Sequence, residues 1–146
     1  MLKPTTAMAL ALCLALPAAA QDADDDDDLP AGLLAGPNKQ DLPEIILSVG
    51  EPLGEPWALK SGGYYEVEIT SDGSGEIALA GAAFLRAIWI DEIVIEGLEI
   101  RPLGLDSLEF DEAGTMEIGF LAIKPGSYEL AVPNGGETQR LQIVIE

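Results

Sequence analysis

Apolar residues recur at every second position along much of this chain. In the stretch 64–70, Tyr65, Val67 and Ile69 fall on one side and alternate with mostly polar residues on the other. Three later stretches repeat the pattern, with apolar sets Met116/Ile118/Phe120, Tyr128/Leu130/Val132 and Leu141/Ile143/Ile145. Alternation with a period of two predicts β-strands that bury one face and expose the other.

Short segments rich in Gly, Pro, Asp, Asn and Ser separate these runs. They are KSGGYY (60–65), SDGSGE (71–76), DEAGT (111–115), KPGSY (124–128) and PNGGE (133–137). Such residues favour tight reversals, so we expect hairpin turns at 71–76 and 124–128. The run SDGSGE lacks the ligand spacing of a calcium loop. About seven or eight strands over 41–146 predict one all-β domain, a Greek-key β-sandwich.

The segment 80–100 is ambiguous. Ile93 and Ile95 share one parity, whereas Leu98 and Ile100 have the other, so Gly97 predicts a bulge or turn. The part 82–90 fits either a short helical crossover or an irregular strand. Trp89, beside Asp91 and Glu92, is a candidate contact surface for a partner, although packing in the core is the commoner fate of a tryptophan.

The first forty residues have a different composition. Residues 1–20 combine Lys3, an apolar stretch and small residues at 18 and 20, the layout of a secretory signal peptide cleaved near Ala20. Its apolar run is too short for a membrane anchor. Residues 21–40 hold the run Asp24–Asp28 with Gly and Pro, which predicts an acidic disordered linker. We therefore expect a periplasmic protein without a membrane span after cleavage.

Charge and residue inventory narrow the functional classes. The chain has a net charge of −19, no histidine, and a single cysteine, Cys13, which lies in the expected signal. Ser-His-Asp and Cys-His catalysis need residues that are missing, so no catalytic residue is assigned and no enzyme is expected. Nucleic acid is a poor partner for such acidity, whereas a cationic protein would be attracted. The acidity also promotes solubility.

The order of features resembles that of the cupredoxin family, small β-sandwiches best known for blue copper. The resemblance covers about 44–146, rests most on IGFLAIKPGSYEL (118–130), and is closest to the cupredoxin-like domains linked to bacterial iron and copper handling. In that family the copper-binding cysteine lies four residues past the tyrosine of this motif, which corresponds here to Val132. The family's histidines would fall in PNGGETQ (133–139) and ALAGAA (78–83).

The residues at these positions include no cysteine or histidine that could bind copper. A type 1 centre needs a thiolate and two imidazoles, so the resemblance implies the fold without its copper site. We expect no cofactor and assign no metal or cofactor-binding residue. Met116 is a lone thioether with core parity. Carboxylates such as Asp91, Glu92, Asp106 and Glu109 offer weak metal binding at most.

These observations lead to three hypotheses. The first is an exported, non-enzymatic cupredoxin-like binding or accessory module, with a surface at Trp89, Asp91 and Glu92 for an unidentified protein partner. The acidity of the chain favours a cationic one. The second is a copper- or iron-handling accessory protein that binds metal weakly through carboxylates. The third is an adhesion or assembly β-domain that pairs through exposed strand edges.

Overall fold

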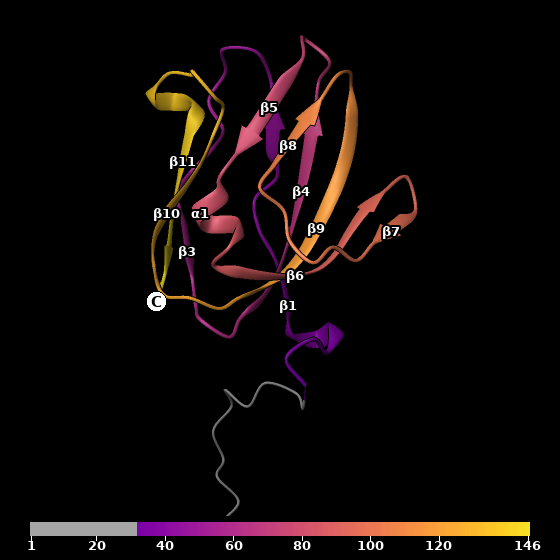
Figure 1. The fold of residues 1–146 in the computed structure, drawn as a ribbon, viewed down its shortest axis with the longest axis vertical. Coiled ribbons are helices and arrows are strands. Elements are labelled where there is room, and N and C mark those ends of the chain that lie inside the picture. Colours follow the sequence, from indigo (N-terminus) through magenta and orange to yellow (C-terminus); the bar gives the residue numbers. More distant parts are fainter. Residues whose placement is uncertain (1–31) are drawn as a thin grey trace, which may run out of the picture.

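The computed structural model describes residues 32–146, which form two β-sheets packed face to face (Figure 1). The larger sheet has the order β1-β4-β9-β6-β7, with β2 also paired to β4. Its strands are β1 (Lys39–Asp41), β2 (Ile45–Leu47), β4 (Tyr64–Ser71), β6 (Ile88–Ile95), β7 (Leu98–Ile100) and β9 (Gly114–Ala122).

The smaller sheet has the order β3-β11-β10-β5-β8. Its strands are β3 (Trp57–Leu59), β5 (Ile77–Ala80), β8 (Ser107–Phe110), β10 (Gly126–Ala131) and β11 (Arg140–Ile145). Three one-turn helices, η1 (Gly36–Asn38), α1 (Ala82–Leu85) and η2 (Glu137–Gln139), complete the described elements. The all-β sandwich prediction is confirmed, but short strands raise the number above the seven or eight expected.

The core lies between the two sheets and follows the predicted alternation. On β4 the side chains of Tyr65, Val67 and Ile69 are buried, and on β9 those of Met116, Ile118 and Phe120 are buried. Phe84 from α1 packs edge-on against Phe120 and Trp57, with ring centroids 5.7 and 6.3 Å apart. Edge-to-face aromatic contacts of this kind add to the stabilisation from buried apolar area.

The fold begins before the predicted boundary at residue 41. Lys39 pairs with Tyr64 and Ile45 with Ile69, so β1 and β2 run parallel to β4 along the same edge. Pro43 lies in the break between them, where a residue without a backbone N–H cannot continue the ladder. The predicted linker thus contributes its last residues to the sheet. The expected signal peptide and Asp24–Asp28 lie outside the described residues.

The hairpins predicted at 71–76 and 124–128 are wrong. The first segment leads from β4 to β5 and the second from β9 to β10, so each connects one sheet to the other. Hairpins occur instead at β6–β7 and β10–β11, whose strands pair antiparallel. Local turn residues indicate that the chain reverses, but the partner of each strand depends on long-range packing.

The ambiguous segment 80–92 contains both alternatives that the sequence allowed. A single helical turn, α1, is followed directly by the eight-residue strand β6. The register of β6 against β9 shifts between Ile90 and Glu92, so Asp91 is an extra residue in the strand. At the end of β6, Glu96 and Gly97 both have positive φ, as a two-residue hairpin turn requires, which confirms the predicted turn at Gly97.

Candidate functional site

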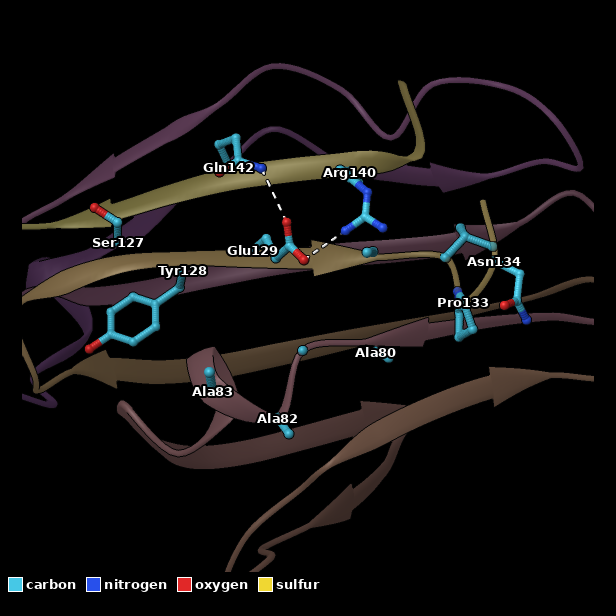
Figure 2. A pocket seen from close by; sticks show the side chains of 13 residues that line it. Ala80, Ala82, Ala83, Ser127, Tyr128, Glu129, Pro133, Asn134, Arg140 and Gln142 are labelled. Atoms are coloured by element: carbon cyan, nitrogen blue, oxygen red, sulfur yellow. Dashed lines mark hydrogen bonds and ion pairs between the residues drawn. The ribbon is translucent and has the colours of Figure 1, made fainter. Parts of the chain in front are cut away.

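The three segments to which the resemblance assigns copper ligands meet at one groove of about 540 Å³ (Figure 2). Ala131 at the end of β10 pairs with Ala80 at the end of β5. This pairing places Val132 and the loop that follows it beside the start of α1. The sandwich therefore brings together the positions to which the resemblance assigns the ligands, here called the ligand end, even though 78–83 lies about fifty residues before Val132 in the chain.

The groove at this ligand end is lined mainly by small apolar side chains. Ala80, Ala82, Val132 and Pro133 border it. On its polar side, Glu129 accepts from Arg140 at 2.7 Å and from Gln142 at 3.4 Å. Type 1 copper requires soft sulfur and imidazole donors, so the residues present do not fit that ion. We derive no metal chemistry from this groove.

A glycine holds the groove's wall close to β10. A Cβ atom at Gly81 would lie 2.4 Å from Leu130 Cδ2 and 2.9 Å from the Glu129 carbonyl oxygen. Both distances are shorter than a van der Waals contact, and the second neighbour is backbone that cannot move aside. The close approach of α1 to β10 therefore depends on glycine at this position.

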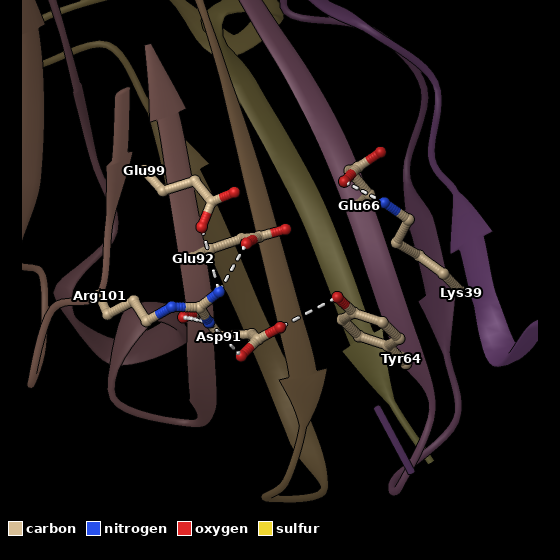
Figure 3. Close-up of polar contacts among 7 residues, drawn as sticks. All are labelled: Lys39, Tyr64, Glu66, Asp91, Glu92, Glu99 and Arg101. Carbon is tan, nitrogen blue, oxygen red and sulfur yellow. Dashed lines mark hydrogen bonds and ion pairs between the residues drawn. The ribbon is translucent and has the colours of Figure 1, made fainter. Parts of the chain in front are cut away.

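The outer face of the larger sheet carries a connected polar network (Figure 3). The guanidinium of Arg101 donates to Asp91 Oδ1 at 3.1 Å and to Glu92 Oε2 and Glu99 Oε2 at 3.2 Å each. The extra residue in β6 brings Asp91 and Glu92 to the same side, where one arginine reaches both. Two of the predicted partner residues are therefore already engaged by the protein's own cation.

Tyr64 extends this network across the sheet. Its hydroxyl donates to Asp91 Oδ2 at 3.1 Å, and its ring is buried although β4 presents it on the outer face. Burial, followed by the hydrogen bond to Asp91, raises the pKa of Tyr64. Nearby, the ammonium of Lys39 bonds Glu66 at 2.5 Å, which raises the pKa of Lys39.

Trp89, the third predicted partner residue, is not in the core. Its side chain is 48% exposed, whereas Trp57 is the buried tryptophan. Trp89 pairs across strands with Leu121 and borders a hollow that also contains the fully exposed Leu103. The alternative that Trp89 packs in the core is wrong, and its role in a contact surface stays a prediction.

The remaining candidate carboxylates lie apart from this network. Asp106 pairs with Arg86 at 2.5 Å on the surface. Glu109 instead lies with Glu76 and Asp111, each offering an oxygen within 4.8 Å of the others. Glu76, by hydrogen bond and by charge, raises the pKa of Glu109. Met116 is buried, as its parity predicted.

Sequence reasoning missed the grouping of Glu76 and Asp111 with Glu109. Glu76 directly precedes β5, and Glu109 lies on β8. These two strands pair antiparallel, with Ile77 opposite Phe110. The alternation of Leu108 and Phe110 indicates a strand, but only the register of β5 against β8 brings the carboxylates together. No local motif could have identified this set.

Solved structures share the architecture of this chain, whereas the two comparisons of its sequence found no match. No family model matches the chain, and no curated protein sequence matches it. Among solved structures, a multi-copper oxidase from Pseudomonas thermotolerans superposes with a TM-score of 0.54 at 15% identity, over 75% of this chain and 30% of that one. A second multicopper oxidase superposes with a TM-score of 0.50 at 6% identity, over 62% and 32% respectively.

These likenesses concern the fold. The chain spans about a third of the length of either oxidase, and the identities are too low to transfer a site. Within residues 32–146 no helix is long and apolar enough to cross a membrane. Two packed sheets and these superpositions together establish that the described residues form a β-sandwich with a cupredoxin-like fold.

Proposed function

We propose that this protein is an exported, non-enzymatic cupredoxin-like module that binds a protein partner and has no type 1 copper site. The observation that carries the proposal is the ligand end, where Val132 and Ala80 occupy a groove built from small apolar side chains. A scaffold of two packed sheets holds this end in place. Export rests on the signal-like composition of residues 1–20.

Several features support a binding role rather than catalysis. The chain has no histidine, and its single cysteine is Cys13 in the expected signal. The carboxylates Asp91 and Glu92 are held by Arg101, an arrangement that stabilises a surface. Trp89 is exposed beside them, and exposed tryptophans are enriched where proteins meet.

Metal analysis of the purified protein tests this proposal. The full-length protein, produced with its own signal in a bacterial host supplied with copper, is dialysed and measured by inductively coupled plasma mass spectrometry. We expect copper well below one equivalent and no absorption band of a copper–thiolate bond. One equivalent of copper that survives dialysis would overturn the proposal, and export is checked by the mass of the secreted chain's N-terminus.

A second candidate function is weak binding of metal through carboxylates. The grouping of Glu76, Glu109 and Asp111 favours it, because three carboxylate oxygens within 4.8 Å of one another could share a cation. Their exposure and the lack of imidazole keep the expected affinity low. Calorimetric titration with Cu²⁺ and Ca²⁺, with Glu109→Gln as the variant, measures it directly.

A further inference from the structure

The β6–β7 hairpin extends beyond the edge of the smaller sheet. Figure 1 shows β7 at the side of the molecule farthest from β10 and β11. Ile93 pairs with Ile100 and Ile95 with Leu98, so these four side chains share the face that turns toward the core. Ile93 is buried, but the smaller sheet does not reach the others, and Ile95, Leu98 and Ile100 are 40%, 62% and 40% exposed.

A groove of about 280 Å³ lies where this uncovered face meets the connection from β8 to β9. Ile95, Phe110 and Met116 provide its apolar surface. Leu98 and Ile100 continue the same apolar face along the hairpin. An exposed apolar face of this kind on a soluble domain is typical of an interaction site.

The rim of this hairpin groove is acidic. Four carboxylates line it: Glu96, Glu109, Asp111 and Glu112. An oxygen of Glu76 lies within 4.8 Å of oxygens of Glu109 and Asp111. The ion pairs within residues 32–146 involve Lys39, Arg86, Arg101 and Arg140, and none of them includes a rim carboxylate. The mutual repulsion of these carboxylates would be relieved by a cation brought from outside.

We propose that a basic segment of another protein binds to the hairpin groove, lined by Ile95 and the rim carboxylates, and to the adjoining hairpin face of Leu98 and Ile100. The segment's apolar side chains cover the hairpin face, and its lysines or arginines meet the rim carboxylates. Charge complementarity selects this occupant, because a second copy of so acidic a chain would add repulsion. The inference rests on the proposed binding function and names the partner's chemistry.

Binding of a synthetic peptide tests the proposal. A fluorescein-labelled peptide of alternating lysine and leucine is titrated with the full-length protein, and anisotropy is measured over a range of NaCl concentrations. We expect saturable binding that weakens with salt. Peptides of lysine with serine, or of glutamate with leucine, lack one of the two complementary features and should bind at least about tenfold more weakly.

Matched variants separate the groove from the general acidity of the chain. Glu109→Gln with Asp111→Asn should weaken peptide binding by about tenfold, because two of the four rim charges are lost. Glu55→Gln with Glu137→Gln changes the net charge equally at exposed positions outside the groove and should weaken it less than about twofold. Leu98→Ser should weaken it by about fivefold, whereas Leu33→Ser, at a similarly exposed leucine, should not.

Three outcomes would overturn the proposal. Equal weakening by both charge variants would make the attraction a property of the whole surface. Unchanged binding by Leu98→Ser would remove the hairpin face from the site. Displacement of the peptide by CaCl₂ beyond that by NaCl of equal ionic strength would assign the carboxylates to a metal instead.

These outcomes are distinct from a failure of the proposed function. A purified protein that holds one equivalent of copper contradicts the metal-free module, whatever the peptide does. A metal-free protein that does not bind the peptide contradicts only the groove. Thermal unfolding of every variant verifies that the domain is folded, and the exposed positions chosen are expected to change stability by less than about 0.5 kcal/mol.

Discussion

The two acidic regions of this domain differ in how their charges are compensated. On the outer face of the larger sheet, Asp91, Glu92 and Glu99 surround Arg101, and Tyr64 donates to Asp91. At the hairpin groove, Glu109 and Asp111 lie together with Glu76 without a cation among the described residues. The first region has its carboxylates paired within the domain, whereas the second has no such pairing among the described residues.

The comparison teaches that carboxylate number alone does not identify a binding surface in an acidic chain. Asp91 and Glu92 stand next to a tryptophan in the sequence and so attract attention, yet they are held by the protein itself. Glu76 and Asp111 stand in ordinary turn sequences and become notable through the pairing of β5 with β8. Whether a charge is available depends on its neighbours in space.

Among the variants that test this comparison, Arg101→Gln is expected to change the free energy of unfolding most. Three carboxylates would lose their shared cation, two of them with side chains 15% and 20% exposed, so we expect a loss of about 1–2 kcal/mol in the free energy of unfolding. Arg140→Gln, which breaks one exposed pair with Glu129, should cost less than about 0.5 kcal/mol. Urea denaturation measures both. Equal losses would show that the Arg101 network is no more than a surface ion pair.

Tyr64→Phe should have a smaller effect, about 1 kcal/mol, through loss of the hydrogen bond to Asp91. The folded-state pKa of Tyr64 is raised above the ordinary value of 10.0, so the unfolded chain releases this proton first. The stabilisation that the protonated Tyr64 hydroxyl provides is complete below the ordinary pKa of 10.0 and is lost as the pH rises through the folded-state pKa. Tyr64→Phe should therefore lose less stability than the native protein at alkaline pH.

Denaturation at neutral and alkaline pH checks this prediction. Tyr128→Phe is the control, because the hydroxyl of Tyr128 donates to the Lys124 carbonyl at the surface. A Tyr128→Phe variant with the same alkaline behaviour as Tyr64→Phe would contradict the role of the network.

Glu109→Gln should have the smallest effect and the opposite sign. Glu76 raises the folded-state pKa of Glu109 above the ordinary 4.5, so the folded state binds this proton more tightly than the unfolded chain. The stabilisation that this bound proton gives to the folded state is complete below the ordinary pKa of 4.5 and is lost as the pH rises through the folded-state pKa. Near neutral pH the variant should therefore melt at a slightly higher temperature than the native protein.

Melting temperatures between about pH 4 and pH 7 test this reversal. The difference between Glu109→Gln and the native protein should grow with pH across this range and shrink with added salt. Glu137→Gln, at an exposed position away from the rim, provides the control. A Glu109→Gln variant that is less stable near neutral pH would show that the rim carboxylates are not in conflict.

Much of the fold could be predicted because it follows from local patterns. Alternation identified the buried faces of β4, β9 and β11, and Gly97 marked a turn that the structure contains. The motif around Tyr128 indicated a cupredoxin-like sandwich, which the superpositions support. The predicted hairpins failed because turn residues specify a reversal and not the sheet to which the next strand belongs.

The sequence by itself determined the inventory and the periodicity: which side chains alternate toward a core, how acidic the surface is, and that no imidazole is present. The tertiary structure alone decided which carboxylates meet a cation and which do not. Because β6 contains an extra residue, Asp91 and Glu92 both contact Arg101. The register of β5 against β8 brings Glu76 close to Glu109. Periodicity is a property of neighbouring residues, whereas charge compensation depends on distances between strands far apart in the chain.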